Sequence, residues 1–185
     1  MSDSDAGISR TWGTDAAERR LPFPCDAWLE AFDLALFRGI TIRSSPAVLF
    51  RWLCQLRVAP YSYDWIDNYG RRSPRELTPG IEKLEVGQTV MTIFELVEFE
   101  TDRHLTMRSR PGTRAERLFG RGAVSYLIVP QAVERCRLLV KILIATSPAT
   151  LAWPVRWLLP WGDLVMMRRQ LLNFKRLAER MSRGG

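Results

Sequence analysis

The C-terminal part of the sequence carries an apolar stripe that needs a large apolar surface to cover it. Between residues 161 and 181, apolar side chains recur at intervals of three and four residues, and most basic side chains fall elsewhere. This spacing predicts one long amphipathic helix. The stripe consists of Leu164, Met167, Leu171, Phe174 and Ala178. The rest of the chain must therefore supply a matching apolar face.

The preceding segments supply that face as antiparallel strands. Residues 135–146 alternate between apolar side chains and a mixture that includes Arg137 and Lys141, which predicts a strand with one buried and one partly solvated face. Similar runs, separated by turn signals, predict further strands. Their ranges are 32–43, 83–100 with a possible split near Gly87, 104–110 and 117–129.

Two helices are expected between the first strand and the later ones. Ser45 and Pro46 form a helix-start signal, and residues 47–56 follow with leucines at helical spacing. A second short helix or turn is expected at residues 63–69, before a stretch rich in glycine and proline.

Together these elements predict an α+β fold in which a curved antiparallel sheet wraps around the terminal helix. We assign residues 25–185 to this single domain and residues 1–24 to a mobile polar tail. Within the strands, β-bulges are expected at Gly39, Gly120 and Gly122.

The positive charge of the chain does not by itself indicate a polyanionic partner. The formal net charge is +7, but the basic residues are scattered and mixed with acids, which is typical of a solvated surface. We therefore expect no nucleic-acid partner.

The longest uncharged stretch, residues 142–155, is too short and too rich in proline to span a bilayer. Since no secretory signal is evident either, we expect a cytoplasmic protein.

Three cysteines and one histidine limit the metal and cofactor chemistry of the chain. Cys25, Cys54 and Cys136 lack the spacing of a zinc site, and their odd number does not indicate a disulfide framework. His104 is the single histidine, so a two-histidine metal site within one chain is excluded. We expect neither a metal nor a cofactor, and the sequence contains no signal for an oligomeric state.

Several segments of the chain carry a recognisable family pattern. They are residues 42–53, 77–87, 137–141 and the terminal helix, together with residues 61–74 and 161–172. With this order of elements, residues 32–181 resemble the helix-grip fold of the START-like superfamily, which includes polyketide cyclases and lipid-transfer domains (SRPBCC). The last two segments resemble an uncharacterised bacterial subgroup. The resemblance implies a deep cavity between sheet and helix for a lipid, sterol or polyketide, in a superfamily of carriers, sensors and enzymes.

Residues 61–72 form the densest cluster of polar and aromatic side chains, which suits a pocket rim that orients the polar end of an apolar ligand. The alternative is a scaffold role, in which the acids cap backbone groups and pair with arginines. On the terminal helix, apolar side chains would line the cavity, and methionine suits a pocket that adapts to its ligand, although ordinary hydrophobic core is the more frequent role of such a stripe. The candidate ligand-binding residues are Tyr61, Tyr63, Trp65, Asn68, Arg72, Trp157, Leu164, Met167, Leu171 and Phe174.

Few side chains are candidates for catalysis. Tyr63 and Asp64 are the first candidates for an acid or base, provided that either faces the cavity. Glu95 lies among apolar residues of a predicted strand, where a buried carboxyl group would be a candidate acid, although an exposed Glu95 is the favoured interpretation. Both faces of that strand, residues 92–99, are apolar, so its orientation is open. His104 starts a strand, and a solvent-facing or structural role is favoured over proton transfer.

The scarcity of titratable groups favours a protein that holds a hydrophobic small molecule over one that transforms it. One alternative is a cyclase or dehydratase that acts on such a ligand in the same cavity. A second is a peripheral membrane protein that docks through Trp153 to Trp161, a segment rich in aromatic side chains. A hydrophobic loop packed on the domain is the other interpretation of that segment.

Overall fold

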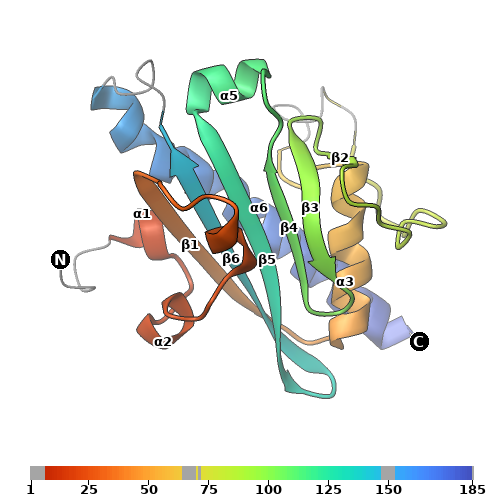
Figure 1. The fold of residues 1–185 in the computed structure, drawn as a ribbon. Helices are drawn as coiled ribbons and strands as arrows, with labels where there is room; N and C mark the ends of the chain where they lie inside the picture. Colours follow the sequence, from red (N-terminus) through yellow and green to blue (C-terminus); the bar gives the residue numbers. More distant parts are fainter. Residues whose placement is uncertain (1–6, 64–69, 71, 147–152, 185) are drawn as a thin grey trace.

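The structure, a computed structural model, describes residues 7–63, 70, 72–146 and 153–184. At its centre is one antiparallel sheet of six strands in the order β1-β6-β5-β4-β3-β2 (Figure 1). The strands are β1 (Leu34–Ile42), β2 (Thr89–Val90), β3 (Phe94–Glu100), β4 (His104–Ser109), β5 (Arg121–Ala132) and β6 (Arg135–Ala145). The first strand of the chain thus pairs with the last one.

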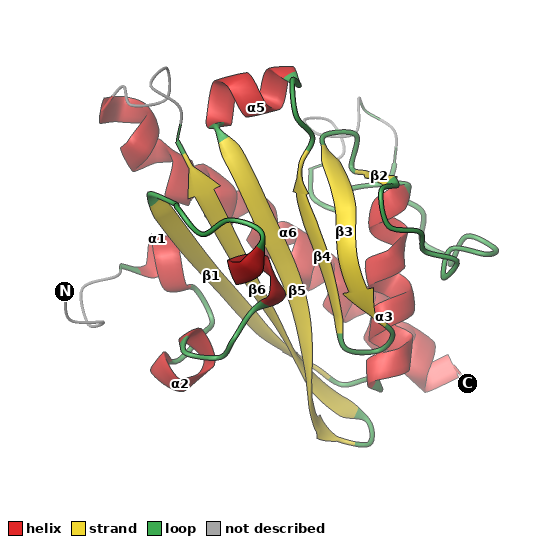
Figure 2. Ribbon diagram, in the orientation of Figure 1, coloured by secondary structure: helices red, strands yellow, loops and turns green. Residues whose placement is uncertain are grey.

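The helices divide between the two faces of this sheet (Figure 2). The long α6 and the shorter α3 cover the inner face, whereas the N-terminal segment lies over the outer face and along the β1 edge. The helical elements are α1 (Ile8–Thr11), α2 (Ala16–Arg19), η2 (Pro24–Ala27), α3 (Pro46–Cys54), η3 (Gln55–Arg57), α5 (Arg114–Phe119) and α6 (Trp153–Gly184). A curved antiparallel sheet packed on a long terminal helix is the predicted helix-grip architecture, which the structure confirms.

The start of α3 follows directly from its sequence. The Val48 backbone N–H donates a hydrogen bond to Ser45 Oγ at 3.4 Å, and Pro46 occupies the first turn, where its missing N–H is not needed. The predicted helix start is therefore confirmed.

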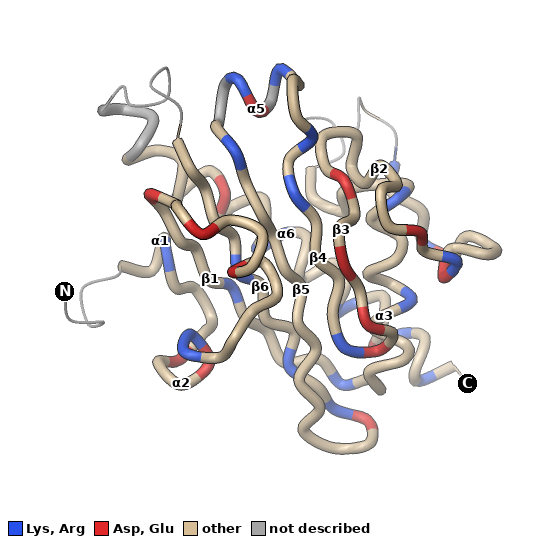
Figure 3. The backbone as a smooth tube through the Cα atoms, viewed as in Figure 1, with Lys and Arg blue, Asp and Glu red and all other residues tan. Residues whose placement is uncertain are grey.

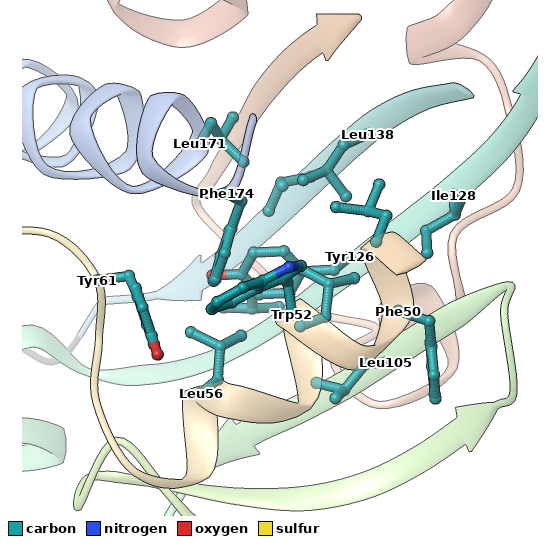
Figure 4. Packing of buried hydrophobic residues seen from close by; sticks show 14 of the residues in the cluster. Phe50, Trp52, Leu56, Tyr61, Leu105, Tyr126, Ile128, Leu138, Leu171 and Phe174 are labelled. Atoms are coloured by element: carbon teal, nitrogen blue, oxygen red, sulfur yellow. The ribbon is translucent and has the colours of Figure 1, made fainter. Parts of the chain in front are cut away.

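The inner face forms the main hydrophobic core with α3 and α6. Leu171 and Phe174 of the predicted stripe are fully buried, and they pack with Tyr126 from the sheet and Trp52 from α3 (Figure 4). The Tyr61 ring completes this group, with its centroid 5.3 Å from that of Phe174 and 6.3 Å from that of Trp52. The sheet thus covers the stripe of the terminal helix.

The outer face carries a second, smaller core. Phe23, Cys25 and Leu29 from the N-terminal segment cover Leu139 and Leu143 of β6, and all five are buried. The β6 face predicted to be partly solvated is instead buried at these positions, because the preceding chain lies over it.

Residues 7–24, predicted to be a mobile tail, form α1 and α2 and contact the sheet. Gly13 passes so close to β1 that an added Cβ atom would lie 2.1 Å from the carbonyl oxygen of Gly39. The Gly39 N–H also donates to Trp12 O at 3.0 Å. Because Gly39 keeps regular register within β1, its role is this close backbone approach and not the predicted bulge.

A side-chain contact holds the same segment to β6. Arg137 Nε lies 2.7 Å from Glu18 Oε1, and Arg137 Nη2 donates to Gly13 O at 2.7 Å. The Glu18 carboxylate also accepts the Asp15 N–H in a capping box that starts α2. One glutamate therefore joins a local helix start to the sheet.

The terminal helix is longer than predicted. It begins at Trp153 and continues through Pro160, whereas the sequence analysis placed its start at residue 161. Pro154 lies in the first turn, where a proline is tolerated. The interpretation of Trp153 to Trp161 as a loop is therefore wrong. The predicted helix at residues 63–69 lies mostly outside the described residues.

The glycines before and within β5 do not mark bulges. Gly120 ends α5 with a φ of 88°, and an added Cβ atom would lie 2.2 Å from Ala145 O. Gly122 keeps regular register with Ile144. Since α5 occupies residues 114–119, the predicted strand at 117–129 starts later than expected.

Polar side chains fix the C-terminal half of α6. Lys175 Nζ donates to Thr41 O at 2.7 Å, and Glu179 Oε1 accepts the Arg43 N–H at 3.0 Å. Although burial opposes its ionisation, the Arg43 N–H, the Lys175 ammonium group 3.1 Å away and the charge of Arg183 lower the pKa of Glu179.

The charged residues are spread over the elements, with basic and acidic positions interspersed (Figure 3). Among the described helices, none combines the length and the apolar composition that a bilayer crossing requires. Among the charged residues whose side chains the structure describes, Arg38 is the exception to this surface distribution, because it is fully buried.

Candidate functional site

A hollow with a volume of about 780 Å³ lies between the N-terminal half of α6 and the inner face of the sheet. Its polar side chains are Tyr63, Ser109 and Asp163, and the rest of the lining is apolar or glycine. The lining residues are Tyr63, Ile93, Phe94, Ser109, Gly120, Gly122, Val124, Ile142, Ile144, Leu159, Gly162, Asp163, Val165 and Met166. The sheet and α6 thus enclose an apolar space large enough for a small organic molecule.

A second hollow of about 390 Å³ continues this space toward the core. The two share lining residues on both walls, namely Ile93, Phe94, Val124, Ile142, Asp163 and Met166. The additional residues of the inner part include the buried Tyr126, Gln170 and Ser62. We call the combined space the pocket, and the part near Tyr126 and Gln170 its inner end.

Arg38 and Asp163 form a largely buried ion pair beside the pocket. Arg38 donates to Asp163 Oδ2 from Nη2 at 2.7 Å and from Nε at 3.1 Å. The same guanidinium donates to the carbonyl oxygens of Ser9, Phe37 and Pro160. Arg38 is fully buried, whereas a fifth of the Asp163 side chain remains exposed and Asp163 lines the pocket. The pair therefore presents its acid, and not its base, to a ligand.

Burial raises the pKa of Asp163 from an ordinary 3.8 to about 6, and Arg38 offsets only part of this increase. Burial likewise lowers the pKa of Arg38, and Asp163 opposes that effect. Asp163 consequently exchanges its proton close to neutral pH, which gives the pocket one group capable of acid-base chemistry.

A hydrogen-bond chain closes the inner end. Tyr126 Oη lies 2.6 Å from Gln170 Oε1, and Gln170 Nε2 donates to Pro60 O at 2.6 Å. Burial, with a smaller contribution from Asp163, raises the pKa of Tyr126, so its hydroxyl stays protonated. The chain connects β5, α6 and the loop after η3.

Two of the predicted ligand-binding residues line the pocket. Tyr63 lines its wider part, with the Arg169 guanidinium 5.9 Å from its ring centroid, and Met167 lines the inner end. Tyr61, Leu164, Leu171 and Phe174 are buried core residues outside both linings. Trp157 and Arg72 are exposed. Asp64, Trp65 and Asn68 lie outside the described residues.

Glu95 and His104 lie on the outer face, away from the pocket. Glu95 pairs with Arg108 at 3.4 Å, and His104 Nε2 lies 3.8 Å from Glu100 Oε2. The inner positions of β3 are Phe94, which lines the pocket, Leu96 and, beyond the irregularity between Leu96 and Glu98, Phe99. This arrangement settles the orientation that the sequence left open, and it removes both residues from contact with a pocket ligand.

Sequence reasoning missed Arg38, Asp163, Tyr126 and Gln170. For Arg38 a signal existed, because it occupies an inward position of a strand whose other inward residues are apolar. Asp163 and Gln170 are two turns apart on α6, but their importance appears only once the facing strand is known.

The described residues contain no cluster of three or more histidine, cysteine, aspartate or glutamate side chains that suits a metal ion. Cys25, Cys54 and Cys136 are free and buried. The pocket chemistry of the described residues thus rests on Asp163 and on hydroxyl and amide groups.

Comparison with known proteins finds no matching family model and no matching curated protein. Several solved structures resemble this one. A protein from Arthrobacter aurescens aligns at a TM-score of 0.49 with 11% identity, over 81% of this chain and 91% of that chain. Norcoclaurine synthase from Thalictrum flavum aligns at 0.45 with 11% identity, over 77% and 84%. The di-domain ARO/CYC protein BexL aligns at 0.47 with 10% identity, over 80% of this chain and 47% of that chain.

The strand order and α6 display the helix-grip architecture on their own. The predicted fold is therefore confirmed, whereas the resemblance to the polyketide cyclase and START-like superfamily stays a prediction. At such low identity it carries no information on ligand or activity, which must come from the pocket itself.

Proposed function

We propose that this protein binds or carries a hydrophobic small molecule of the lipid, sterol or polyketide kind in the pocket under α6. The observation that carries the proposal is the apolar hollow of about 780 Å³, a volume typical of small-molecule sites. Each 100 Å² of apolar ligand surface removed from water would contribute about 2.5 kcal/mol to binding. Met166 and Met167 give one wall the adaptable side chains that suit flexible ligands.

The test is a fluorescence titration with the neutral apolar probe N-phenylnaphthylamine. We expect saturable binding at a single site. Gly122→Leu places a side chain in the pocket from β5, where an added Cβ atom meets only Leu143 O at an ordinary 3.5 Å. This variant should fold and bind the probe at least about tenfold more weakly, because the added side chain takes ligand volume.

Ala132→Leu is the matched control, since Ala132 is an exposed residue at the other end of the same strand. It should bind the probe like the unmodified protein. Equal probe binding by all three proteins, or no binding by any of them, would contradict a ligand site in this pocket.

A second candidate function is an enzyme of the cyclase or dehydratase type in the same pocket. The observation that favours it is the Asp163 carboxyl group, which lines the pocket with a pKa of about 6 and can accept and return a proton near neutral pH. Among the catalytic candidates predicted from the sequence that the structure describes, Tyr63 is the one that lines the pocket.

Mass spectrometry of hydroxylated polyketide and lipid mixtures incubated with the protein would detect ring closure or loss of water. Asp163→Asn should abolish such turnover while the probe still binds. Turnover that persists in Asp163→Asn would remove Asp163 from consideration, and absence of turnover with retained probe binding would leave binding alone as the function.

A third candidate, membrane docking, is favoured by exposed apolar side chains on α6. Trp157, Leu158, Trp161 and Val165 are exposed, and Val165 also lines the pocket. The basic Arg168 and Arg169 follow in the next turn, which suits an anionic lipid surface. The predicted segment begins at Trp153, but the side chains of residues 153–156 lie outside the described part.

Vesicles that contain phosphatidylserine should sediment the protein at low salt. Replacing both Trp157 and Trp161 with alanine should abolish sedimentation. Val133→Ala, in an exposed turn of the sheet, is the control and should leave it unchanged. Equal sedimentation of all variants would exclude this surface as the docking site.

A further inference from the structure

The hydrogen atoms at the inner end of the pocket can be assigned from its heavy-atom geometry. Pro60 O is a carbonyl oxygen and only accepts, so the Gln170 group 2.6 Å from it must be the amide nitrogen. The amide oxygen then faces Tyr126 Oη, also at 2.6 Å. Tyr126 must therefore donate its single hydrogen to Gln170. Met167 Sδ, at 4.0 Å, is a much more distant acceptor for that hydrogen, and the lone pairs of the hydroxyl oxygen can accept a hydrogen bond.

The buried side chains of Ser62 and Gln170 at the inner end also direct their hydrogens at acceptors within the protein. Ser62 Oγ directs its one hydrogen at Met166, with the carbonyl oxygen at 3.1 Å and Sδ at 3.5 Å. The second Gln170 N–H faces Met91 Sδ at 3.9 Å. Thr92, the remaining hydroxyl residue in this lining, is exposed. The buried hydroxyl groups thus offer lone pairs and no free hydrogen.

Asp163 adds a further acceptor. Its Oδ2 accepts both bonds from Arg38, while Oδ1 accepts none from the described residues. Arg38 belongs to neither lining and is fully buried, so its donors do not reach the pocket. When ionised, Asp163 has no hydrogen to give.

At the inner end, the side chains of Tyr126, Ser62, Gln170 and Asp163 thus accept hydrogen bonds and donate none to a ligand, whereas the hydroxyl groups of Tyr63 and Ser109 belong to the wider part of the pocket. We infer that the inner end selects a ligand whose polar group donates a hydrogen bond, namely an alcohol, phenol or amine, over one that places a carboxylate, ester or ether there. This inference rests on the proposed function. A ligand with only acceptors at that end would leave the buried acceptors unpaired, and a carboxylate would also face the negative charge of Asp163.

The test compares two isomers that differ only in the donor. Dodecanol carries a hydroxyl group, and methoxyundecane has the same atoms with the oxygen inside the chain. Each displaces N-phenylnaphthylamine from the protein at about pH 8, above the Asp163 pKa of about 6. We expect dodecanol to bind at least about tenfold more tightly than methoxyundecane and dodecanoate, because only dodecanol satisfies a buried acceptor.

Two variants probe the acceptors. Asp163→Asn introduces an N–H₂ donor, so the preference for dodecanol over dodecanoate should shrink several-fold. Tyr126→Phe keeps the ring and removes one acceptor, so the preference for dodecanol should also fall. This second variant tests the inference independently if Asp163→Asn does not fold. A circular dichroism melt of each variant establishes folding.

The outcomes separate the two proposals. Equal displacement by the two isomers, or tighter binding of dodecanoate, overturns the inference while ligand binding stands. Absence of probe binding to the unmodified protein overturns the proposed function, and with it the inference.

Discussion

Arg38 on β1 and Asp163 on α6 form a charged pair 125 positions apart in the sequence, with Nη2 of the arginine 2.7 Å from Oδ2 of the aspartate. The pair joins the first strand to the terminal helix at the border of the pocket. Its arginine also donates to three carbonyl oxygens, so its loss would leave several buried acceptors unpaired.

Arg38→Met should destabilise the protein by about 3 kcal/mol in urea unfolding, because it leaves a mostly buried carboxylate and three carbonyl oxygens without their partner. The control is Arg103→Met, since Arg103 pairs with Glu100 at the surface with both side chains at least half exposed. That change should cost less than about 1 kcal/mol. Similar losses in the two variants would show that the buried pair is no stronger than a surface pair.

The Asp163 carboxyl group should titrate near pH 6 in the folded protein, which carbon-detected NMR of labelled aspartate can follow. Arg38 from β1 and Tyr126 from β5 face it, and neither titrates in that range. Since the folded pKa is raised above the unfolded one, the folded state holds its proton more tightly. The contribution of Asp163 to stability should therefore fall as pH rises from about 4 to about 6, by at most about 3 kcal/mol.

A midpoint near the ordinary value of 3.8 would refute the burial of this carboxylate. Asp163→Asn should also remove the corresponding part of the pH dependence of the unfolding free energy. The opposite contribution of Glu179, whose pKa is lowered, should remain in that variant.

Alanine at two strand glycines should have opposite effects. Gly39→Ala would place Cβ 2.7 Å from Gly13 O and 2.9 Å from Arg137 Nη2, so we expect a loss of about 1–3 kcal/mol in urea unfolding. Gly122→Ala meets only Leu143 O at 3.5 Å and should be neutral or slightly stabilising. Equal stability of the two variants would contradict the close passage of the N-terminal segment over β1.

The three cysteines should be unreactive in the folded protein. Burial raises the pKa of Cys25 and Cys136 to about 11 and that of Cys54 to about 12, which suppresses the reactive thiolate. A thiol reagent such as dithionitrobenzoate at mildly alkaline pH should label none of them before unfolding and all three in denaturant. Rapid labelling of the native protein would show that at least one thiol is accessible.

The fold was predictable from sequence wherever a periodic pattern met a clear boundary signal. The alternation of apolar residues predicted β6, and the apolar stripe predicted the helix α6 that covers the sheet. Ser45 and Pro46 predicted the start of α3. The start of α6 was predicted too late in the chain. Pro154 and Pro160 indicate a helix break by local rules, whereas the helix of the folded protein contains both.

The site was less predictable than the fold. Met167 and Tyr63 were found because their residue types suit a pocket. Arg38, Asp163 and Tyr126 come from β1, α6 and β5, so only the three-dimensional structure brings them together. Their roles depend on which neighbour uses each donor and acceptor, and no spacing within one element encodes that.

Methyl NMR of the protein during titration with N-phenylnaphthylamine reports directly where the ligand binds. We expect chemical-shift changes of the Ile93, Val124, Ile142 and Met166 methyl groups, which line the pocket from both walls, and none at Val133, which is 85% exposed and lies outside the pocket. Shifts confined to Val133 and other surface methyl groups, or no shifts at all, would contradict a ligand-binding pocket under α6.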